Sequence, residues 1–400
     1  MAELLTDRLA IHGGAPVRAV DKSWPQWPIV GDEERRALLE VFNSGKWWYG
    51  ERVAQFEAAY ALFQDARFCV TCNSGTAAAE IGIQALGFGP GDEVIVPAYT
   101  FIATASSVAR MGATPVFVDV DESWCIDPAA VEAAITPRTK AIVPVHFGSR
   151  VADMDRLNAL ADKHGLVVME DACHSWGSKW KGKGTGALGR CGVFSFQMSK
   201  NMTAGEGGAI LTDDEELADR CRAISNCGRS KGGAWYGHDL IGTNARMTEF
   251  AAAVLSAQLE RLEEQTLYRE RMGAILNEEL AGVEGLVPQP GDERMTRRAY
   301  HLYPFRLDEK AFGCSRERFV EAARAEGMSL TAGYPVPLYN QPVFERLRGD
   351  TPAPSCPVTE DLCTRSGVWF NHSQLLSPEE DIRLIAKAYR KIKDHVSELA

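Results

Sequence analysis

The chain has 400 residues, of which 45% are hydrophobic, and its 54 acidic and 43 basic residues give a formal net charge of -11. A chain of this length can bury a substantial core and is expected to form two domains. The acidic balance offers no basic surface for nucleic acid, and no apolar run reaches the roughly 18 residues that span a bilayer. We therefore expect a globular protein that binds neither nucleic acid nor membranes.

The compartment is indicated by the first residues and by the cysteines. The stretch MAELLTDRLAIHGGAPVRAV lacks the charged-then-apolar pattern of a signal peptide. Ten cysteines are scattered along the chain, which favours reduced thiols and a cytoplasmic protein. Cys69 and Cys72 form a CxxC pair, but no second pair follows at zinc spacing, so we expect no metal site.

From residue 67 onward, β-branched apolar runs alternate with helical patterns. Strands are predicted at residues 67–72, 92–97, 114–121, 140–147, 165–171, 192–197 and 207–213. Helices are predicted between them at residues 75–86, 100–111, 127–135 and 153–164. This alternation predicts an α/β fold with a mostly parallel sheet that helices cover on both faces, and ligands bind such sheets at the carboxyl ends of the strands.

The C-terminal part has a different pattern. A long helix is predicted over residues 248–272, followed by a strand at 301–307, a helix at 315–327, a proline-rich loop at 333–344 and a last helix at 377–396. These elements suit a second, smaller α/β domain. We expect an N-terminal arm over residues 1–25, a large domain over 26–270 and a small C-terminal domain over 271–400.

Three features at the ends of predicted strands carry chemistry. Gly75 and Thr76, in NSGT, open a helix after a strand, and a helix N-terminus suits a phosphate; a glycine needed only for a tight turn is the alternative. Asp171 ends a buried strand, where it either caps the next segment or holds a specific partner. Lys200 follows another apolar run, in QMSKN. Taken alone, this position predicts a solvated lysine in a loop.

The three features together match the needs of one cofactor. Pyridoxal phosphate requires a phosphate site, a carboxylate beside its pyridine nitrogen and a lysine that bonds to its aldehyde. Gly75, Asp171 and Lys200 occur in that order, at distances that one sheet can gather. The sequence therefore favours a pyridoxal phosphate enzyme.

The motifs resemble those of the DegT/StrS-type aminotransferases, a fold-type I pyridoxal phosphate family that acts on keto-sugars and keto-cyclitols. The resemblance runs from GGAPVR near the N-terminus to VWFNHSQLL near the C-terminus. Its most specific pieces are NSGTAA, PAYTFIATA, EDACHSWG, FSFQMSKNMTAGEGGAILTDD and GTNARMTEFAAAVL. It implies a large domain with a mostly parallel sheet, a smaller C-terminal domain and transfer of an amino group in two half-reactions.

The resemblance also implies roles for individual residues. Lys200 is expected to bond to the cofactor and to move the proton, and Asp171 to pair with the pyridine nitrogen. The expected phosphate ligands are Gly75, Thr76 and the Ser195 hydroxyl. Phe101 is expected to stack on the cofactor ring, although it equally suits a core position, and His174 to pack against the ring or its 3-hydroxyl side. Asn244 is expected to reach the phosphate of a neighbouring subunit, which makes the protein a homodimer with shared active sites.

Gln197 bears on the substrate. Many family members that act on nucleotide sugars carry histidine at this position, whereas SFQ resembles the branch of glutamine:scyllo-inosose aminotransferases and 3-amino-5-hydroxybenzoate synthases. We therefore expect L-glutamine, or else L-glutamate, as amino donor and a keto-cyclitol or related ketone as acceptor. Arg229, Tyr334 and His372 are candidate residues of the acceptor pocket.

Several alternatives stay open at this point. A nucleotide-keto-sugar acceptor needs basic groups for its diphosphate, and the basic stretch at residues 294–298 offers them unless it is a solvated face. 3-Amino-5-hydroxybenzoate synthesis is a second alternative. A dehydratase relative carries histidine in place of the lysine, so Lys200 argues against that class. A sensor needs an attached output domain, for which the chain has no surplus length.

Overall fold

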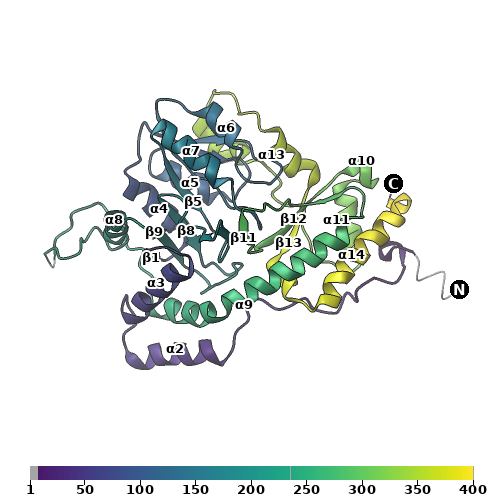
Figure 1. Ribbon diagram of the computed structural model, residues 1–400, viewed down its shortest axis with the longest axis horizontal. Helices are drawn as coiled ribbons and strands as arrows, with labels where there is room; N and C mark the ends of the chain where they lie inside the picture. Colours follow the sequence, from purple (N-terminus) through teal and green to yellow (C-terminus); the bar gives the residue numbers. More distant parts are fainter. Residues whose placement is uncertain (1–7, 235, 400) are drawn as a thin grey trace.

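The computed structural model describes residues 8–234 and 236–399 (Figure 1). Its largest sheet has seven strands in the order β1-β9-β8-β5-β4-β2-β3. The strands are β1 (Phe68–Cys72), β2 (Glu93–Pro97), β3 (Thr114–Val118), β4 (Thr139–Ile142), β5 (Val167–Asp171), β8 (Cys191–Ser195) and β9 (Gly208–Thr212). Only β9 runs antiparallel to its neighbours, so the predicted α/β fold with a mostly parallel sheet is confirmed.

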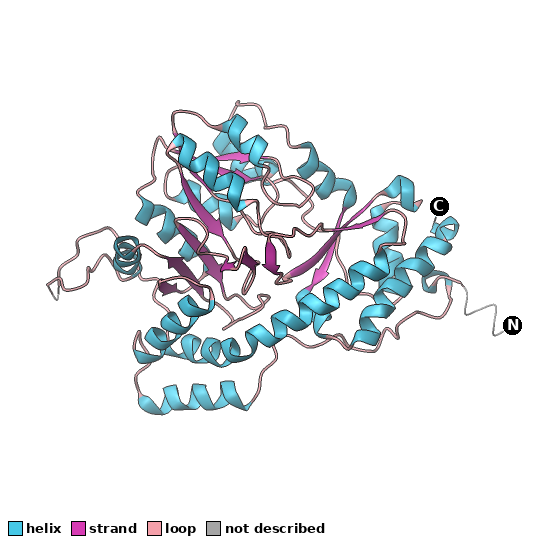
Figure 2. Cartoon of the chain, viewed as in Figure 1, coloured by secondary structure: helices cyan, strands magenta, loops and turns pink. Residues whose placement is uncertain are grey.

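Helices cover both faces of this sheet (Figure 2). Val193 and Ile210 belong to a core cluster with α4 (Gly75–Leu86), α5 (Ala103–Arg110) and α8 (Glu215–Ser225). Their neighbours Phe194 and Leu211 belong to the opposite cluster, which contains α3 (Glu51–Phe63). Successive strand residues point to opposite faces, so these fully apolar strands bury both sides. A third cluster packs α6 (Pro128–Ala134) and α7 (Met154–His164) at the β4 and β5 end.

The predicted helices of the large domain are observed, but some element ends differ. The helix predicted at residues 100–111 begins only at Ala103, because residues 100–102 form the turn after β2. The strands predicted to end at 121 and 147 stop at Val118 and Ile142. Beyond Ile142 the regular strand ends, although Val145 still forms an isolated parallel bridge with Asp171 and lines the cavity described below.

One helix connects the two main cores of the molecule. α9 (Glu249–Leu280) has 32 residues and extends eight residues beyond the predicted end at 272. Its first half packs against α2 (Asp32–Ser44) and α3, while Met272, Leu276 and Leu280 enter the C-terminal core. Figure 1 shows this helix running along the molecule beneath both sheets.

The C-terminal core is built on a second sheet of three antiparallel strands, in the order β10-β12-β13. Its strands are β10 (Leu286–Pro288), β12 (Leu302–Leu307) and β13 (Gly367–Asn371). Helices α10 (Glu309–Phe312), α11 (Arg316–Ala325) and α14 (Glu379–Asp394) pack in this core, whereas α12 (Pro342–Arg348) and α13 (Pro357–Asp361) lie against the cores of the large domain. Leu9 of the N-terminal segment packs in this same core. The boundaries proposed at residues 25 and 270 stay a prediction.

A small third sheet joins the two cores. β6 (Lys179–Trp180) pairs with β7 (Lys183–Gly184) and with β11 (Met295–Arg297), which lies in the chain between β10 and β12 of the C-terminal sheet. In the part of the chain that the structure describes, no helix is long and apolar enough to cross a membrane.

Candidate active site

A cavity of about 540 Å³ lies at the carboxyl ends of β5 and β8 and extends to the C-terminal sheet. The residues of the large domain that line it include the predicted cofactor residues Gly75, Thr76, Phe101, Asp171, His174, Ser195 and Lys200. The C-terminal part of the chain contributes His301, Leu302, Tyr334, Trp369 and Asn371. The fold therefore gathers phosphate cradle, strand-end acid and lysine around one space.

The start of α4 forms one end of the cavity. The Ser74 hydroxyl caps the helix by accepting a hydrogen bond of 3.1 Å from the Ala77 amide. A Cβ atom on Gly75 would lie 2.6 Å from the Cβ of Ser195, so β8 and α4 approach this closely only because residue 75 is glycine. The first amides of a helix have no partner within it, and here they lie beside the Ser195 hydroxyl. The group of donors fits a phosphate.

Asp171 ends β5 and is almost fully buried. Its Oδ2 accepts a hydrogen bond of 2.7 Å from the Thr104 hydroxyl, and its Oδ1 accepts one of 3.2 Å from the Cys173 amide. A further hydroxyl, of Thr100, lies 3.1 Å from that of Thr104. These donors fix the orientation of the carboxylate at the cavity, where it can pair with a pyridine nitrogen.

The adjacent carboxylate, Glu170, has a purely structural set of partners. It is fully buried and accepts hydrogen bonds of 2.7 Å from the amides of Gly186, Leu188 and Gly189. His146 lies 2.8 Å away through its Nε2. Because strand residues alternate in direction, Glu170 anchors the loop behind β5 while Asp171 faces the cavity.

Lys200 lies in the turn after β8, with its ammonium group at the cavity. Burial lowers the pKa of its amine, and the neighbouring Cys173 and Asp171 only partly oppose this effect. Its Nζ lies 5.7 Å from the centre of the Trp176 ring and has no hydrogen-bond or ion-pair partner among the described residues. A lysine with a lowered pKa and no partner is prepared to act as a nucleophile and as a base.

Three histidines are buried around this lysine. His174 and His301 stand with ring centres 4.3 Å apart, and His301 and His372 with centres 5.7 Å apart. Burial lowers the pKa of each far below the usual value, so all three rings are neutral. His174 and His301 line the cavity, whereas His372 lies behind it and is 1% exposed.

Gln197 lines the cavity and also stabilises the turn that carries Lys200. Its Oε1 accepts hydrogen bonds of 2.9 Å from the Ser199 amide and 2.8 Å from the Ser199 hydroxyl. The amide group of Gln197 is thereby oriented with its donor side available. It can donate a hydrogen bond to a ligand, but its oxygen is already occupied.

The remaining predicted residues lie in different places. Phe101 is 56% exposed at the cavity, and Tyr334 lines the opposite side. Within one protomer, the structure does not bring Arg229, Asn244 or His372 into the cavity lining. Asn244 is exposed in the bridge that pairs it with Asn226, on the side of the molecule where the long loop after α8 projects (Figure 1).

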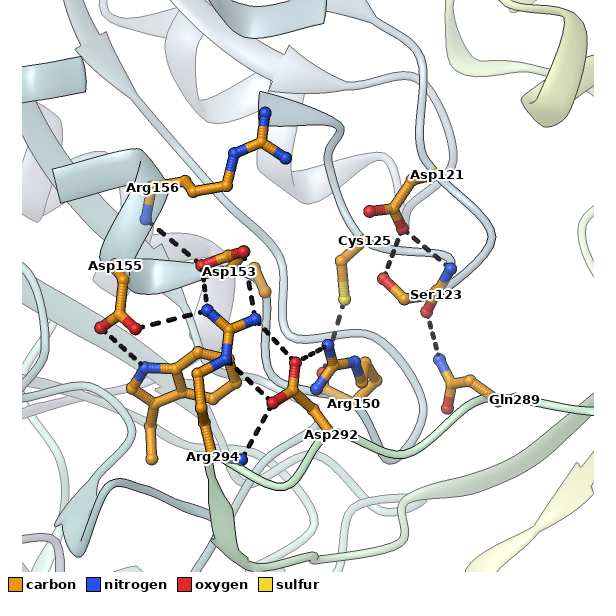
Figure 3. Close-up of polar contacts among 12 residues, drawn as sticks. Asp121, Ser123, Cys125, Arg150, Asp153, Asp155, Arg156, Gln289, Asp292 and Arg294 are labelled. Atoms are coloured by element: carbon orange, nitrogen blue, oxygen red, sulfur yellow. Dashed lines mark hydrogen bonds and ion pairs between the residues drawn. The ribbon is translucent and has the colours of Figure 1, made fainter. Parts of the chain in front are cut away.

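The arginine side chains of the basic stretch at residues 294–298 bind other groups of the same protein. Arg294 donates hydrogen bonds of 2.9 Å to Asp153 and 2.7 Å to Asp292, and Asp292 also accepts one of 2.6 Å from Arg150 (Figure 3). The Arg294 hydrogen bond is the main cause of the lowered pKa of Asp292. This network joins the large domain to the segment that enters β11.

The two following arginines are engaged as well. Arg297 contacts Glu263 and the Gly177 carbonyl, and Arg298 donates to the Ser149 hydroxyl at 3.0 Å. The expected solvated basic face is therefore absent from this described segment, and so is a free diphosphate site.

Sequence reasoning missed several residues of the site. Thr104, His301 and Trp176 all contact the predicted residues, and each belongs to a motif quoted for the resemblance or to the predicted strand at 301–307. The available signal for Thr104 was its place in the PAYTFIATA motif, at the start of a helix that follows a strand of the sheet. Trp27 lies in WPQWP, a stretch that also resembles the family, but nothing in that stretch indicated its contact with the Lys200 backbone.

The arrangement of these groups is that of a pyridoxal phosphate enzyme. The family model of the DegT/DnrJ/EryC1/StrS aminotransferases matches residues 28–388, and the chain belongs to this family. It is an aminotransferase, and its cofactor is pyridoxal 5'-phosphate. The expected family, enzyme class and cofactor are thereby confirmed.

Named relatives cover nearly the whole chain. The chain is 38% identical over 377 residues to 3-amino-5-hydroxybenzoate synthase of Amycolatopsis mediterranei, covering 91% of this chain and 96% of the relative. It is 39% identical over 417 residues to L-glutamine:2-deoxy-scyllo-inosose aminotransferase of Micromonospora echinospora, covering 96% and 97%. Among solved structures, 3-amino-5-hydroxybenzoic acid synthase superposes with a TM-score of 0.86 at 36% identity, covering 94% of this chain and 99% of that one.

Proposed function

We propose that the protein transfers the amino group of L-glutamine to a keto-cyclitol in the biosynthesis of an aminocyclitol secondary metabolite. The observation that carries this proposal is the chemistry of the cavity. Its described lining contains no arginine and a single lysine, Lys200, while Gln197, Ser199 and Asn371 offer uncharged hydrogen-bonding groups. Such a lining suits a neutral polyhydroxylated ring better than a diphosphate.

The residues of this chain divide the work of holding the cofactor. Gly75, Thr76 and Ser195 bind the phosphate, and Asp171 keeps the pyridine nitrogen protonated. Phe101 and His174 pack on the ring, and the neutral state of His174 avoids a second positive charge beside the nitrogen. The cofactor, when bound, supplies an electron sink for the carbanion that forms at the donor's α-carbon.

Lys200 performs the proton transfer. Burial lowers its pKa and so favours the neutral amine, the form of Nζ that can remove the proton from the α-carbon of the donor. The same nitrogen returns a proton in the opposite half-reaction, when the ketone acceptor receives the amino group. Donor and acceptor use one site in turn, so the kinetics are ping-pong.

The protein forms a homodimer with shared active sites in this proposal. The surface of α2 and of the following loop exposes large apolar side chains, with Phe42 59% and Trp48 62% exposed, and exposed apolar patches of this kind mark interaction sites. Asn244 lies outside the cavity of its own protomer, which agrees with a role in the cavity of the partner. Sedimentation of an Asn244→Ala variant, with titration of its cofactor, separates dimer formation from phosphate binding.

We place this reaction in the cytoplasm. The ten cysteines of the chain are all free thiols in the described structure, and most are buried, which agrees with a reducing compartment.

A panel of ketone acceptors tests the proposed substrate. The protein is first converted to its aminated form with glutamine and then mixed with scyllo-inosose, 2-deoxy-scyllo-inosose, a nucleotide keto-sugar or a carboxylated cyclic ketone. Recovery of the original visible spectrum with the inososes alone supports the proposal. Recovery with the nucleotide keto-sugar alone, or with the carboxylated ketone alone, contradicts it and supports the corresponding relative's class of reaction.

A further inference from the structure

The carbonyl groups of Ser199 and Lys200 both accept hydrogen bonds from side chains in distant parts of the chain. The Ser199 carbonyl accepts a hydrogen bond of 3.1 Å from Nε2 of His372, which follows β13. The Lys200 carbonyl accepts one of 3.0 Å from Nε1 of Trp27, in the N-terminal WPQWP stretch. A lysine side chain has four rotatable bonds, so the position of its Nζ depends on how firmly these two carbonyls are fixed.

The two donors also support each other. The rings of Trp27 and His372 meet edge to face, with centres 4.6 Å apart. The next residue of the turn, Asn201, is held through its side chain, whose oxygen lies 3.0 Å from Nδ1 of His301 and whose amide donates to the Tyr300 carbonyl. The turn is therefore fixed at three successive residues by three separate segments.

Arg269 of α9 lies behind this arrangement and is fully buried. Its Cζ stands 5.4 Å from the centre of the Trp27 ring, and none of its three guanidinium nitrogens has a hydrogen-bond partner among the described residues. Burial alone lowers its pKa to about 9. An unpaired buried charge is costly to the fold, so its presence here calls for an explanation other than stability.

The charge of Arg269 bears on the state of His372. After burial, Arg269 is the next cause of the lowered pKa of His372, and a neutral imidazole carries one ring hydrogen. Because the Ser199 carbonyl can only accept, that hydrogen is assigned to Nε2, which leaves Nδ1 as an acceptor that is buried and has no partner in the described structure.

We propose that Trp27, His372 and Arg269 are positioning residues for Lys200. Trp27 and His372 fix the two carbonyls by donating hydrogen bonds to them, and Arg269 holds the Trp27 ring in place by lying over its face. The inference rests on the proposed role of Lys200, but the first measurement that tests it does not require turnover.

The test compares Trp27→Phe and Arg269→Met with the matched controls Trp24→Phe and Arg271→Met. Trp24 belongs to the same stretch but contacts Arg18, and Arg271 lies on the exposed side of α9. Amide hydrogen exchange of the peptide covering residues 198–203 is measured in the cofactor-free proteins. We expect faster exchange in the first pair and wild-type exchange in the controls, with Arg269→Lys restoring slow exchange.

The second readout is the steady-state kinetics of the holoenzyme. We expect kcat to fall about tenfold in Trp27→Phe and Arg269→Met with little change in KM for glutamine, since misplacing a reacting group by about 1 Å costs up to about 100-fold. If either variant does not fold, His372→Gln and His372→Phe replace the pair, because glutamine keeps a donor near Nε2 and phenylalanine does not.

Unchanged exchange at residues 198–203 overturns the proposal, as does a loss of thermal stability with unchanged exchange and kcat. Equal effects of His372→Gln and His372→Phe also overturn it. Failure of the proposed function is seen separately, as normal turnover by Lys200→Ala.

Discussion

The hydroxyl of Thr104 donates a hydrogen bond of 2.7 Å to Oδ2 of Asp171, from the first turn of α5 to the last residue of β5. The bond fixes the rotation of the carboxylate and leaves Oδ1 to the Cys173 amide. A helix that follows β2 thereby orients the acid at the end of β5.

Replacing Thr104 by valine removes this donor at nearly constant volume. A hydrogen bond to a charged group contributes about 1.5 to 3 kcal/mol, so we expect the Kd for pyridoxal phosphate to rise by roughly tenfold to 100-fold. Ser107→Ala is the matched control, because Ser107 lies on the same helix and donates only to the Ala103 carbonyl. Equal cofactor affinity in the two variants is the contrary result.

Gly75→Ala tests the close approach of α4 and β8. The added Cβ would lie 2.6 Å from the Ser195 Cβ, and both atoms belong to short, stiff parts of the chain. One of the two elements must move, which displaces the phosphate donors, so we expect at least about a tenfold loss of cofactor affinity. Gly282→Ala, where the space is open, serves as the control. Tight cofactor binding by Gly75→Ala argues against the phosphate cradle.

Gln197→His tests the contribution of Gln197 to acceptor choice. The substitution removes the oxygen that accepts two hydrogen bonds from Ser199 and the amide that can donate to a substrate hydroxyl. We expect kcat/KM for the inosose acceptor to fall about tenfold to 100-fold, while the glutamine half-reaction is less affected. Ser199→Ala separates the two functions, because it removes one of the internal bonds only. If both half-reactions slow to the same extent, Gln197 supports the turn that carries Lys200 and does not select the acceptor.

Because His174, His301 and His372 are buried, we predict that the cofactor-free protein loses stability on acidification. Their pKa values are lowered in the folded state, so below about pH 6.5 the unfolded chain binds protons that the folded chain does not. The contribution of these histidines to the free energy of unfolding is therefore fully present above that pH. It decreases as the pH falls toward the folded-state pKa values, by about 1.4 kcal/mol per pH unit for each group.

Urea unfolding at several pH values measures this effect. In His372→Gln the slope of unfolding free energy against pH should fall by about one third, since one of three groups is removed. The exposed His164→Asn is the control and should keep the wild-type slope. An unchanged slope in His372→Gln means that this ring is protonated in the folded protein.

The sequence predicted the main sheet well because its strands are buried on both faces and so read as continuous apolar runs, as in β2 and β8. The order of Gly75, Asp171 and Lys200 was informative for the same reason, since each follows a strand of one sheet. The eight extra residues of α9 were not predicted, because the buried stripe of the helix carries the polar residues Thr266 and Arg269 between its apolar positions in the two cores.

The parts that could not be predicted depend on long-range contacts. Nothing near Trp27 or His372 in the sequence indicates that both donate to the turn of Lys200, because each lies more than 170 residues from it. For the basic stretch around Arg294, the sequence suggested a site that the fold does not form. Its charges suggested a surface for anions, but Asp153 and Asp292 lie opposite it in the fold.

The most direct test of the account follows the visible spectrum of the protein loaded with pyridoxal phosphate while L-glutamine is added. We predict that the visible band bleaches as the amino group passes to the cofactor, that scyllo-inosose restores the band, and that Lys200→Ala, with cofactor bound, shows neither change within the time of one wild-type turnover. Asp171→Ala should retain cofactor weakly and react far more slowly. A band that no amino acid bleaches, or an inosose that never restores it, would contradict the central claim that Lys200 serves a glutamine-dependent cyclitol aminotransferase.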